Sequence, residues 1–172
     1  LATTPAPDAF ATAFLGRIHS MAKSYSLISE AQWGSVSLAT ILATELEPYR
    51  RDDSDRIAVD GPDVAFAPQQ ALAMGLVFHE LATNAAKYGA LSTTEGNIKA
   101  TWQLKNGLLQ VDWIETGGPK PRKRRTPGFG TRLISSQVRA AFGAEVRYDY
   151  GATGLQVSFA MPRDSFLSET GN

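Results

Sequence analysis

The side chains with the clearest chemical potential lie in one short stretch, residues 79–92, which reads HELATNAAKYGALS. At about 100° per residue, a helix here places the carboxylate of Glu80, the amide of Asn84 and the ammonium of Lys87 on one narrow stripe. Asparagine is a poor helix-interior residue because its side chain competes for backbone hydrogen bonds. The stripe therefore indicates either a phosphate and metal site or an ordinary solvated helix face, and the helix alone does not separate the two.

Two further groups of residues could contact a nucleotide. Glu115 ends an alternating apolar segment and is followed at once by glycines, an arrangement that suits hydrogen bonding to an exocyclic amine such as that of adenine. The run Gly128-Phe129-Gly130-Thr131 opens a helical pattern, and the backbone N–H groups and dipole of a helix start suit phosphate oxygens. Each signal is weak alone, since strand-end acids and Gly-x-Gly hinges are common for structural reasons.

The elements that must position these residues follow from periodicity and breakers. Helices are predicted over 8–28, 37–49, 68–88 and 132–142, and strands over 56–60, 97–104, 108–114, 145–150 and 155–161. Asn106-Gly107 between two alternating segments is a strong hairpin signal. This order predicts an α+β fold: a two-layer sandwich whose mixed, mostly antiparallel sheet is covered by helices, preceded by a short helical segment. Residues 117–130 are too rich in glycine, proline and basic residues to be regular, and a frayed tail is expected from residue 164.

The first helix and the ends of the chain set the expected domain limits. Apolar residues recur on the first helix at the spacing of a packed seam, which calls for a partner: Phe14, Ile18, Met21, Tyr25 and Ile28. On the helix predicted over residues 68–88, an apolar stripe expected to be buried borders the polar one: Val77, Leu81, Ala85 and Tyr88. We expect a helical region over 1–50, a main domain over 51–164 and a tail over 165–172.

Composition excludes several classes of function. In 172 residues, 17 lysines and arginines balance 17 aspartates and glutamates, so no overall charge favours nucleic acid or an anionic membrane. The absence of cysteine excludes disulfides and thiolate metal sites, and two histidines exclude a multi-histidine zinc site. No apolar run reaches the ~18 residues of a spanning helix, so no membrane contact is expected within this chain.

Taken in order, these features resemble the ATP-binding domain shared by histidine kinases, gyrase, Hsp90 and MutL. Within that superfamily the sequence is similar to the HWE histidine kinases, whose markers match His79 and Trp113-Ile114-Glu115. The resemblance runs over most of residues 56–162 and implies the ATPase fold of the histidine kinases, known as the Bergerat type. It also likens the first helix to the second helix of the dimerisation and phosphotransfer hairpin.

The resemblance implies ATP and Mg²⁺ as cofactors and a role for each site residue. Asn84 would bind Mg²⁺ through its amide oxygen, and Glu80 matches the acid that polarises the nucleophile in related ATPases. Glu115 takes the place of the adenine-reading acid, with a longer side chain than the usual aspartate. The remaining residues would contact or border the nucleotide: Lys87, Tyr88, Gly117, Gly128, Gly130 and Thr131. His79 and Trp113 mark the family, and geometry on the helix gives His79 no role.

The function implied is that of a protein-histidine kinase of a bacterial two-component system, located in the cytoplasm. It would transfer the γ-phosphoryl group of ATP to a histidine outside this chain, on a phosphoacceptor helix of the same kinase, for relay to a response regulator. A homodimer could form through the first helix. Two alternatives stay open: a non-catalytic phosphotransfer or adaptor module of the same fold, and an anti-sigma-type kinase acting on serine.

Overall fold

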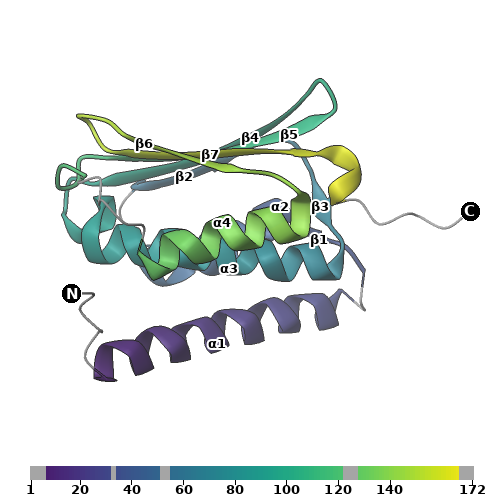
Figure 1. Ribbon diagram of the computed structural model, residues 1–172, viewed down its shortest axis with the longest axis horizontal. Helices are drawn as coiled ribbons and strands as arrows, with labels where there is room; N and C mark the ends of the chain where they lie inside the picture. The colour runs from purple at the N-terminus through teal and green to yellow at the C-terminus, as the bar shows by residue number, and fades with distance from the viewer. Residues whose placement is uncertain (1–6, 32–33, 51–54, 122–127, 167–172) are drawn as a thin grey trace, which may run out of the picture.

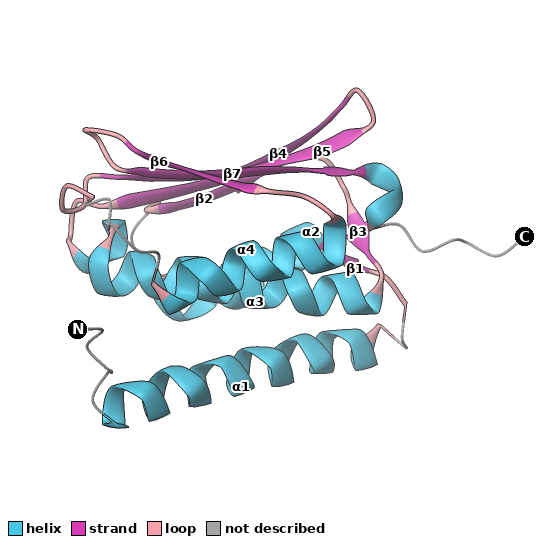
Figure 2. Ribbon diagram, viewed as in Figure 1, coloured by secondary structure: helices cyan, strands magenta, loops and turns pink. Residues whose placement is uncertain are grey.

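The computed structural model describes residues 7–31, 34–50, 55–121 and 128–166, which stack as layers (Figure 1). A five-stranded sheet forms one layer, and helices cover one of its faces. The first helix lies on the far side of that helical layer, away from the sheet (Figure 2). The predicted α+β sandwich with a preceding helical segment is confirmed.

The element bounds follow the predicted order. The helices are α1 (Pro7–Glu30), α2 (Leu38–Leu46), α3 (Pro68–Tyr88) and α4 (Phe129–Phe142). The strands are β1 (Val36–Ser37), β2 (Ile57–Asp60), β3 (Ala65–Phe66), β4 (Asn97–Lys105), β5 (Leu108–Thr116), β6 (Val146–Tyr150) and β7 (Leu155–Pro162). Short 3₁₀ turns cover Glu47–Tyr49, Ala90–Ser92 and Arg163–Ser165. None of the helices that the structure describes combines the length and apolarity needed to cross a membrane.

The large sheet has the strand order β2-β4-β5-β7-β6. Its β4–β5, β5–β7 and β6–β7 pairs are antiparallel, whereas the edge strand β2 runs parallel to β4. Asn106 and Gly107 both have positive φ, 53° and 75°, which is the conformation that a tight two-residue hairpin needs. This turn fixes the register of β4 and β5. It places Glu115, one residue before the end of β5, opposite Ile98 near the start of β4.

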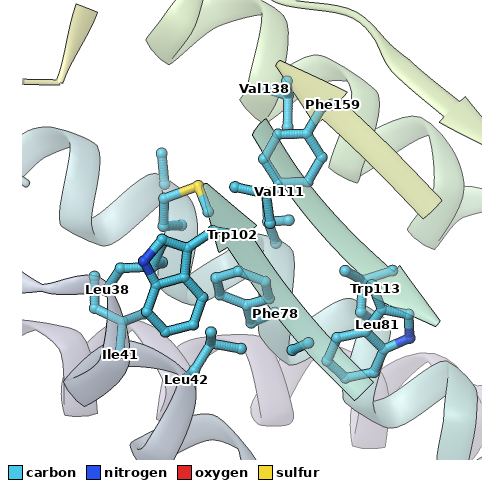
Figure 3. Close-up of a cluster of buried hydrophobic side chains, with 14 of the residues drawn as sticks. Leu38, Ile41, Leu42, Phe78, Leu81, Trp102, Val111, Trp113, Val138 and Phe159 are labelled. Carbon is cyan, nitrogen blue, oxygen red and sulfur yellow. The ribbon is translucent and has the colours of Figure 1, made fainter. Parts of the chain in front are cut away.

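One hydrophobic core lies between the sheet and the helical layer (Figure 3). Phe78 of α3 stacks on Trp113 of β5 with ring centroids 6.4 Å apart. The last described residue joins the same core, because Phe166 is 1% exposed and its ring centroid lies 5.1 Å from that of Phe66. The predicted fraying from residue 164 is therefore wrong for 164–166, while residues 167–172 lie outside the described residues. The proposed boundary at 50/51 adjoins residues 51–54, which are also outside them.

The face that α1 turns towards α3 is not the predicted apolar seam. Of that seam only Ile28 is buried, and the other four residues are about half exposed: Phe14, Ile18, Met21 and Tyr25. The buried side instead carries Ser20 and Ser24, 2% and 5% exposed. Small residues allow the two helix backbones to approach closely, and polar groups between the helices then find partners there.

Candidate nucleotide site

The helix α3 and the start of α4 bring two of the predicted groups together. Gly128 precedes the first turn of α4, which begins at Phe129, three residues before the predicted start, and so includes Gly130. A Cβ atom added at Gly130 would lie 2.7 Å from Oε2 of Glu80 and 3.3 Å from Nδ2 of Asn84. Only glycine allows this approach, and the amide and carboxylate of α3 consequently face a glycine-rich helix start.

A cavity of about 130 Å³ opens beside Asn84. It runs from Asn84 and Tyr88 on α3 to Glu115 at the end of β5, and its remaining lining residues are Gly89, Ala90, Gly118, Pro119, Pro121, Tyr150, Gly154 and Leu155. Ligand pockets typically measure about 300–1,000 Å³, so this volume suits one planar heterocycle better than a whole nucleotide. A base held here would leave its sugar and phosphates to extend past the rim.

Glu115 is held rigidly at the inner wall of the cavity. Its Oε2 accepts a hydrogen bond of 2.9 Å from the backbone N–H of Ala90, and its Oε1 accepts one of 3.0 Å from Nε1 of Trp113. Burial raises the pKa of Glu115 above its ordinary value, and these two hydrogen bonds oppose the shift. Each carboxylate oxygen keeps a further lone pair that can accept a donor from a ligand. The Trp-x-Glu spacing thus has a structural reason, since residues i and i+2 lie on the same face of a strand.

Glu80 is paired with an arginine that the sequence did not single out. Arg17 of α1 donates from Nη2 to Oε2 at 2.9 Å, and its Nε lies 2.6 Å from Oε1. The Nε–H does not point at that oxygen, so the second contact is ionic without being a hydrogen bond. The guanidinium also lies 4.6 Å from the ring centroid of Phe129. Arg17 therefore joins α1, α3 and the glycine-rich start of α4.

His79 has a physical role in the same interface. Its Nδ1 lies 3.1 Å from Oε2 of Glu45 on α2, and Oε1 of Glu45 accepts a hydrogen bond of 2.8 Å from Ser20 of α1. The family-marker histidine thus ties three helices together behind the cavity and does not line it. A sequence signal for this contact existed: Gly16, Ser20 and Ser24 recur every four residues and form a small-residue stripe on α1.

The other predicted residues are placed as follows. Lys87 and Tyr88 are exposed at the end of α3. Tyr88 was predicted to belong to the buried apolar stripe, and this is wrong because the residue is 65% exposed. Thr131 lies in the first turn of α4, where its carbonyl accepts from the Tyr148 hydroxyl at 3.4 Å. Gly117 has a φ of 71° and its carbonyl accepts from Thr93. Residues 122–127 of the basic loop lie outside the described residues.

The residues present fit a magnesium ion only if the nucleotide supplies further ligands. No group of three or more His, Asp or Glu side chains among the described residues could hold a metal ion. Asn84, partly exposed and beside the glycine-rich turn, offers one amide oxygen. Mg²⁺ is commonly bound by one or two protein groups together with substrate phosphates. The donor set is therefore compatible with Mg²⁺ that arrives with a triphosphate.

The comparison of folds identifies the class of this domain. The histidine kinase domain of a blue-light-activated histidine kinase from Erythrobacter litoralis superposes with a TM-score of 0.67 at 19% identity, over 87% of this chain and 74% of that one. A mycobacterial sensor histidine kinase gives a TM-score of 0.58 at 19% identity, over 75% of this chain and 97% of that one. The fold is that of a histidine kinase catalytic domain.

Sequence comparisons give relatives of the same class. The HWE histidine kinase family matches residues 1–63. Blue-light-activated histidine kinase 1 of Erythrobacter litoralis is 31% identical over 158 residues, 89% of this chain and 44% of that protein. The blue-light-activated histidine kinase of Brucella ovis is 30% identical over 166 residues, which are 94% of this chain and 34% of that protein. The chain is thus similar to the HWE histidine kinases over residues 1–63, and it spans less than half the length of these relatives.

Proposed function

We propose that this chain is the ATP-binding catalytic portion of a two-component sensor histidine kinase. The observation that carries the proposal is the line of groups from Glu115 through the cavity to Asn84 and Gly130, because it matches a base, a sugar and a phosphate chain in order. The histidine kinase fold and the similarity to the HWE histidine kinases support it. The γ-phosphoryl group would pass from ATP to a histidine outside this chain.

In this reaction the protein contributes mainly position and charge neutralisation. The P–O bond to the ADP leaving group would break as a P–N bond to the acceptor imidazole forms, and the imidazole would release its proton to solvent. Bound Mg²⁺ neutralises phosphate charge. Asn84 would hold the ion through its amide oxygen, Lys87 is exposed and long enough to follow the phosphates, and the first-turn N–H groups around Gly130 and Thr131 would receive phosphate oxygens.

The part played by Glu80 depends on Arg17. As a catalytic residue Glu80 would have to face the nucleophile, yet the residue is 4% exposed and both carboxylate oxygens lie against the guanidinium. Glu80 would therefore polarise a nucleophile only after this pair opens. While the pair stays closed, Glu80 holds α1 beside the phosphate side of the site.

Partners are proposed on the same basis. A response regulator would receive the phosphoryl group, and the phosphoacceptor helix would come from the same kinase. The half-exposed apolar residues of α1 are suited to a helical homodimer. A cytoplasmic location fits the use of ATP. The balanced charge gives no support for nucleic acid as a partner, and no membrane contact is proposed for this chain.

Calorimetric titration with Mg-ATP tests the proposal. Asn84→Ala should lower the affinity for Mg-ATP by roughly tenfold or more, because a metal ligand is lost. With excess chelator, the variant and the wild type should bind ATP alike. Gln103→Ala, an exposed amide on the open face of β4, is the matched control. No binding of Mg-ATP by the wild type would contradict the proposal and favour a non-catalytic adaptor.

Phosphate chemistry separates the remaining alternative. In a reaction that supplies the acceptor helix of the same kinase, the product should be lost in acid, since phosphohistidine is acid-labile. An acid-stable phosphoserine product would favour the anti-sigma type of serine kinase.

A further inference from the structure

Arg56, just before the edge strand β2, reaches the chain segment that follows α3. Its Nε donates to the carbonyl of Gly96 at 2.8 Å, and its Nη2 donates to the carbonyls of Thr93 and Ala90 at 2.5 and 3.4 Å. The carbonyls of Ala90 and Thr93 belong to, or directly follow, the 3₁₀ turn Ala90–Ser92, and that of Gly96 lies four residues beyond it. The Ala90 carbonyl also accepts from the backbone N–H of Thr93 at 3.4 Å. A guanidinium satisfies several of them at once because its five N–H groups form a rigid fork.

The segment that Arg56 holds is also the wall of the nucleotide cavity. Ala90, 1% exposed, lines the cavity and is bonded on both sides of its backbone. Its carbonyl accepts from Arg56, and its N–H donates to Oε2 of Glu115. Two hydrogen bonds through one residue thus connect a guanidinium outside the cavity with the acid that reads the base.

Packing around Ala90 leaves little freedom for a compensating shift. A Cβ atom at Gly96 would lie 1.7 Å from the Ala90 carbonyl oxygen, so the two backbones are in direct contact. The Thr93 hydroxyl also donates to the carbonyls of Ala90 and Gly117, at 3.3 and 3.0 Å. Loss of the guanidinium would leave the carbonyls of Thr93 and Gly96 without this donor. The Ala90 carbonyl would keep only donors from its own turn, so the direction of the Ala90 N–H would be less firmly fixed.

We propose that Arg56 is a positioning residue for base recognition: by fixing the Ala90 segment it orients Glu115, and it thereby sets the preference for a purine that carries an exocyclic amine. The inference rests on the proposed binding of ATP. Arg56 does not line the cavity and acts only through Ala90 and Glu115. A change at Arg56 should therefore alter the discrimination between bases more than the binding of the phosphates.

The test compares Mg-ATP with the Mg complex of purine riboside triphosphate, which lacks the 6-amino group, by calorimetry on the 172-residue chain. The wild type should bind ATP more tightly than the analogue. Arg56→Met should weaken ATP binding roughly tenfold, as expected for a lost or misdirected hydrogen bond to a charged group, and weaken analogue binding much less. Arg56→Lys has one ammonium in place of the guanidinium, and its affinity for ATP should lie between those of the wild type and Arg56→Met.

Two controls make the result specific. Arg147→Met removes an exposed arginine of β6 and should leave both affinities unchanged. Glu115→Gln should reduce discrimination by itself, and adding Arg56→Met should reduce it little further, because both changes act on the same contact. If Arg56→Met does not fold, Arg56→Lys can replace it in the comparison with Glu115→Gln.

An equal loss of affinity for ATP and the analogue in Arg56→Met would overturn the inference, because it would show a general effect on the fold. Additive effects of the Arg56 and Glu115 variants on discrimination would also overturn it. A wild-type chain that binds neither nucleotide would refute the proposed function itself, and this inference with it.

Discussion

Replacement of Arg17 by methionine isolates the contribution of the ion pair that holds α1 against α3. Arg17→Met keeps most of the aliphatic stem, so the main loss is the positive charge beside Glu80. The side chain of Glu80 is 6% exposed, and its carboxylate would be left buried without a counter-charge. Removing one partner of a buried pair costs about 3–5 kcal/mol, and the lost contact with Phe129 adds roughly 0.5–1 kcal/mol.

Hydrogen exchange of the α1 amides is the appropriate measurement, because the helix can open without unfolding the whole domain. A loss of this size should raise the equilibrium constant for the opening of α1, and with it the exchange rate of its amides, by roughly 100-fold or more. Arg139→Met serves as the reference, since Arg139 and Glu145 form a pair of similar length, 3.2 Å, with side chains 73% and 82% exposed. That variant should change stability by less than about 1 kcal/mol.

A double variant distinguishes lost charge pairing from lost packing. In Arg17→Met with Glu80→Gln the unpaired charge is gone, so part of the protection of α1 should return. Equal, small effects of Arg17→Met and Arg139→Met would refute the reasoning, because the buried pair would then contribute no more than an exposed one. If the α1 amides of the double variant are no better protected than those of Arg17→Met, the lost stability comes from packing and not from the unpaired carboxylate.

Two more predictions concern the site. Gly130→Ala places a Cβ atom 2.7 Å from Oε2 of Glu80 and should lower stability by about 1–3 kcal/mol. Thermal-shift assays should also show weaker binding of Mg-ATP. Gly151→Ala, whose Cβ would lie 3.5 Å from its nearest neighbour, should have neither effect. The raised pKa of Glu115 means that the folded chain binds its proton more readily than the unfolded chain, so stability should fall as pH rises from 4.5 through the raised pKa. Urea unfolding should show this fall in the wild type and not in Glu115→Gln; equal pH slopes would contradict the assignment.

Local signals were sufficient for the elements that carry the site. Pro68 begins α3 at the first helical position and Gly89 follows its last residue, so both predicted limits are confirmed. Asn106-Gly107 likewise fixed the hairpin. Because these signals span a few residues each, they report on the backbone alone and not on which elements meet.

Contacts between distant segments could not be predicted in the same way. Arg17 and Glu80 are 63 residues apart, and Arg56 and Gly96 are 40 apart. Nothing in the local sequence of either partner specifies the other. The apolar spacing on α1 indicated a packed seam without deciding between a second chain and its own domain as the partner. A buried ion pair and small residues, which show no hydrophobic periodicity, determine how that helix lies on α3. The role of His79 was missed for the same reason, because its partner Glu45 belongs to another helix.

The way α1 is attached has a mechanical consequence. Ile28, near its C-terminal end, is 1% exposed and belongs to the core, whereas towards the N-terminus the helix is held by the polar contacts of Ser20 and Arg17. At 1.5 Å per residue, Arg17 lies about 16 Å along the helix from Ile28, so a tilt of about 10° there displaces the guanidinium by about 3 Å. A small rotation of the helix about Ile28 would therefore be enough to separate Arg17 from Glu80.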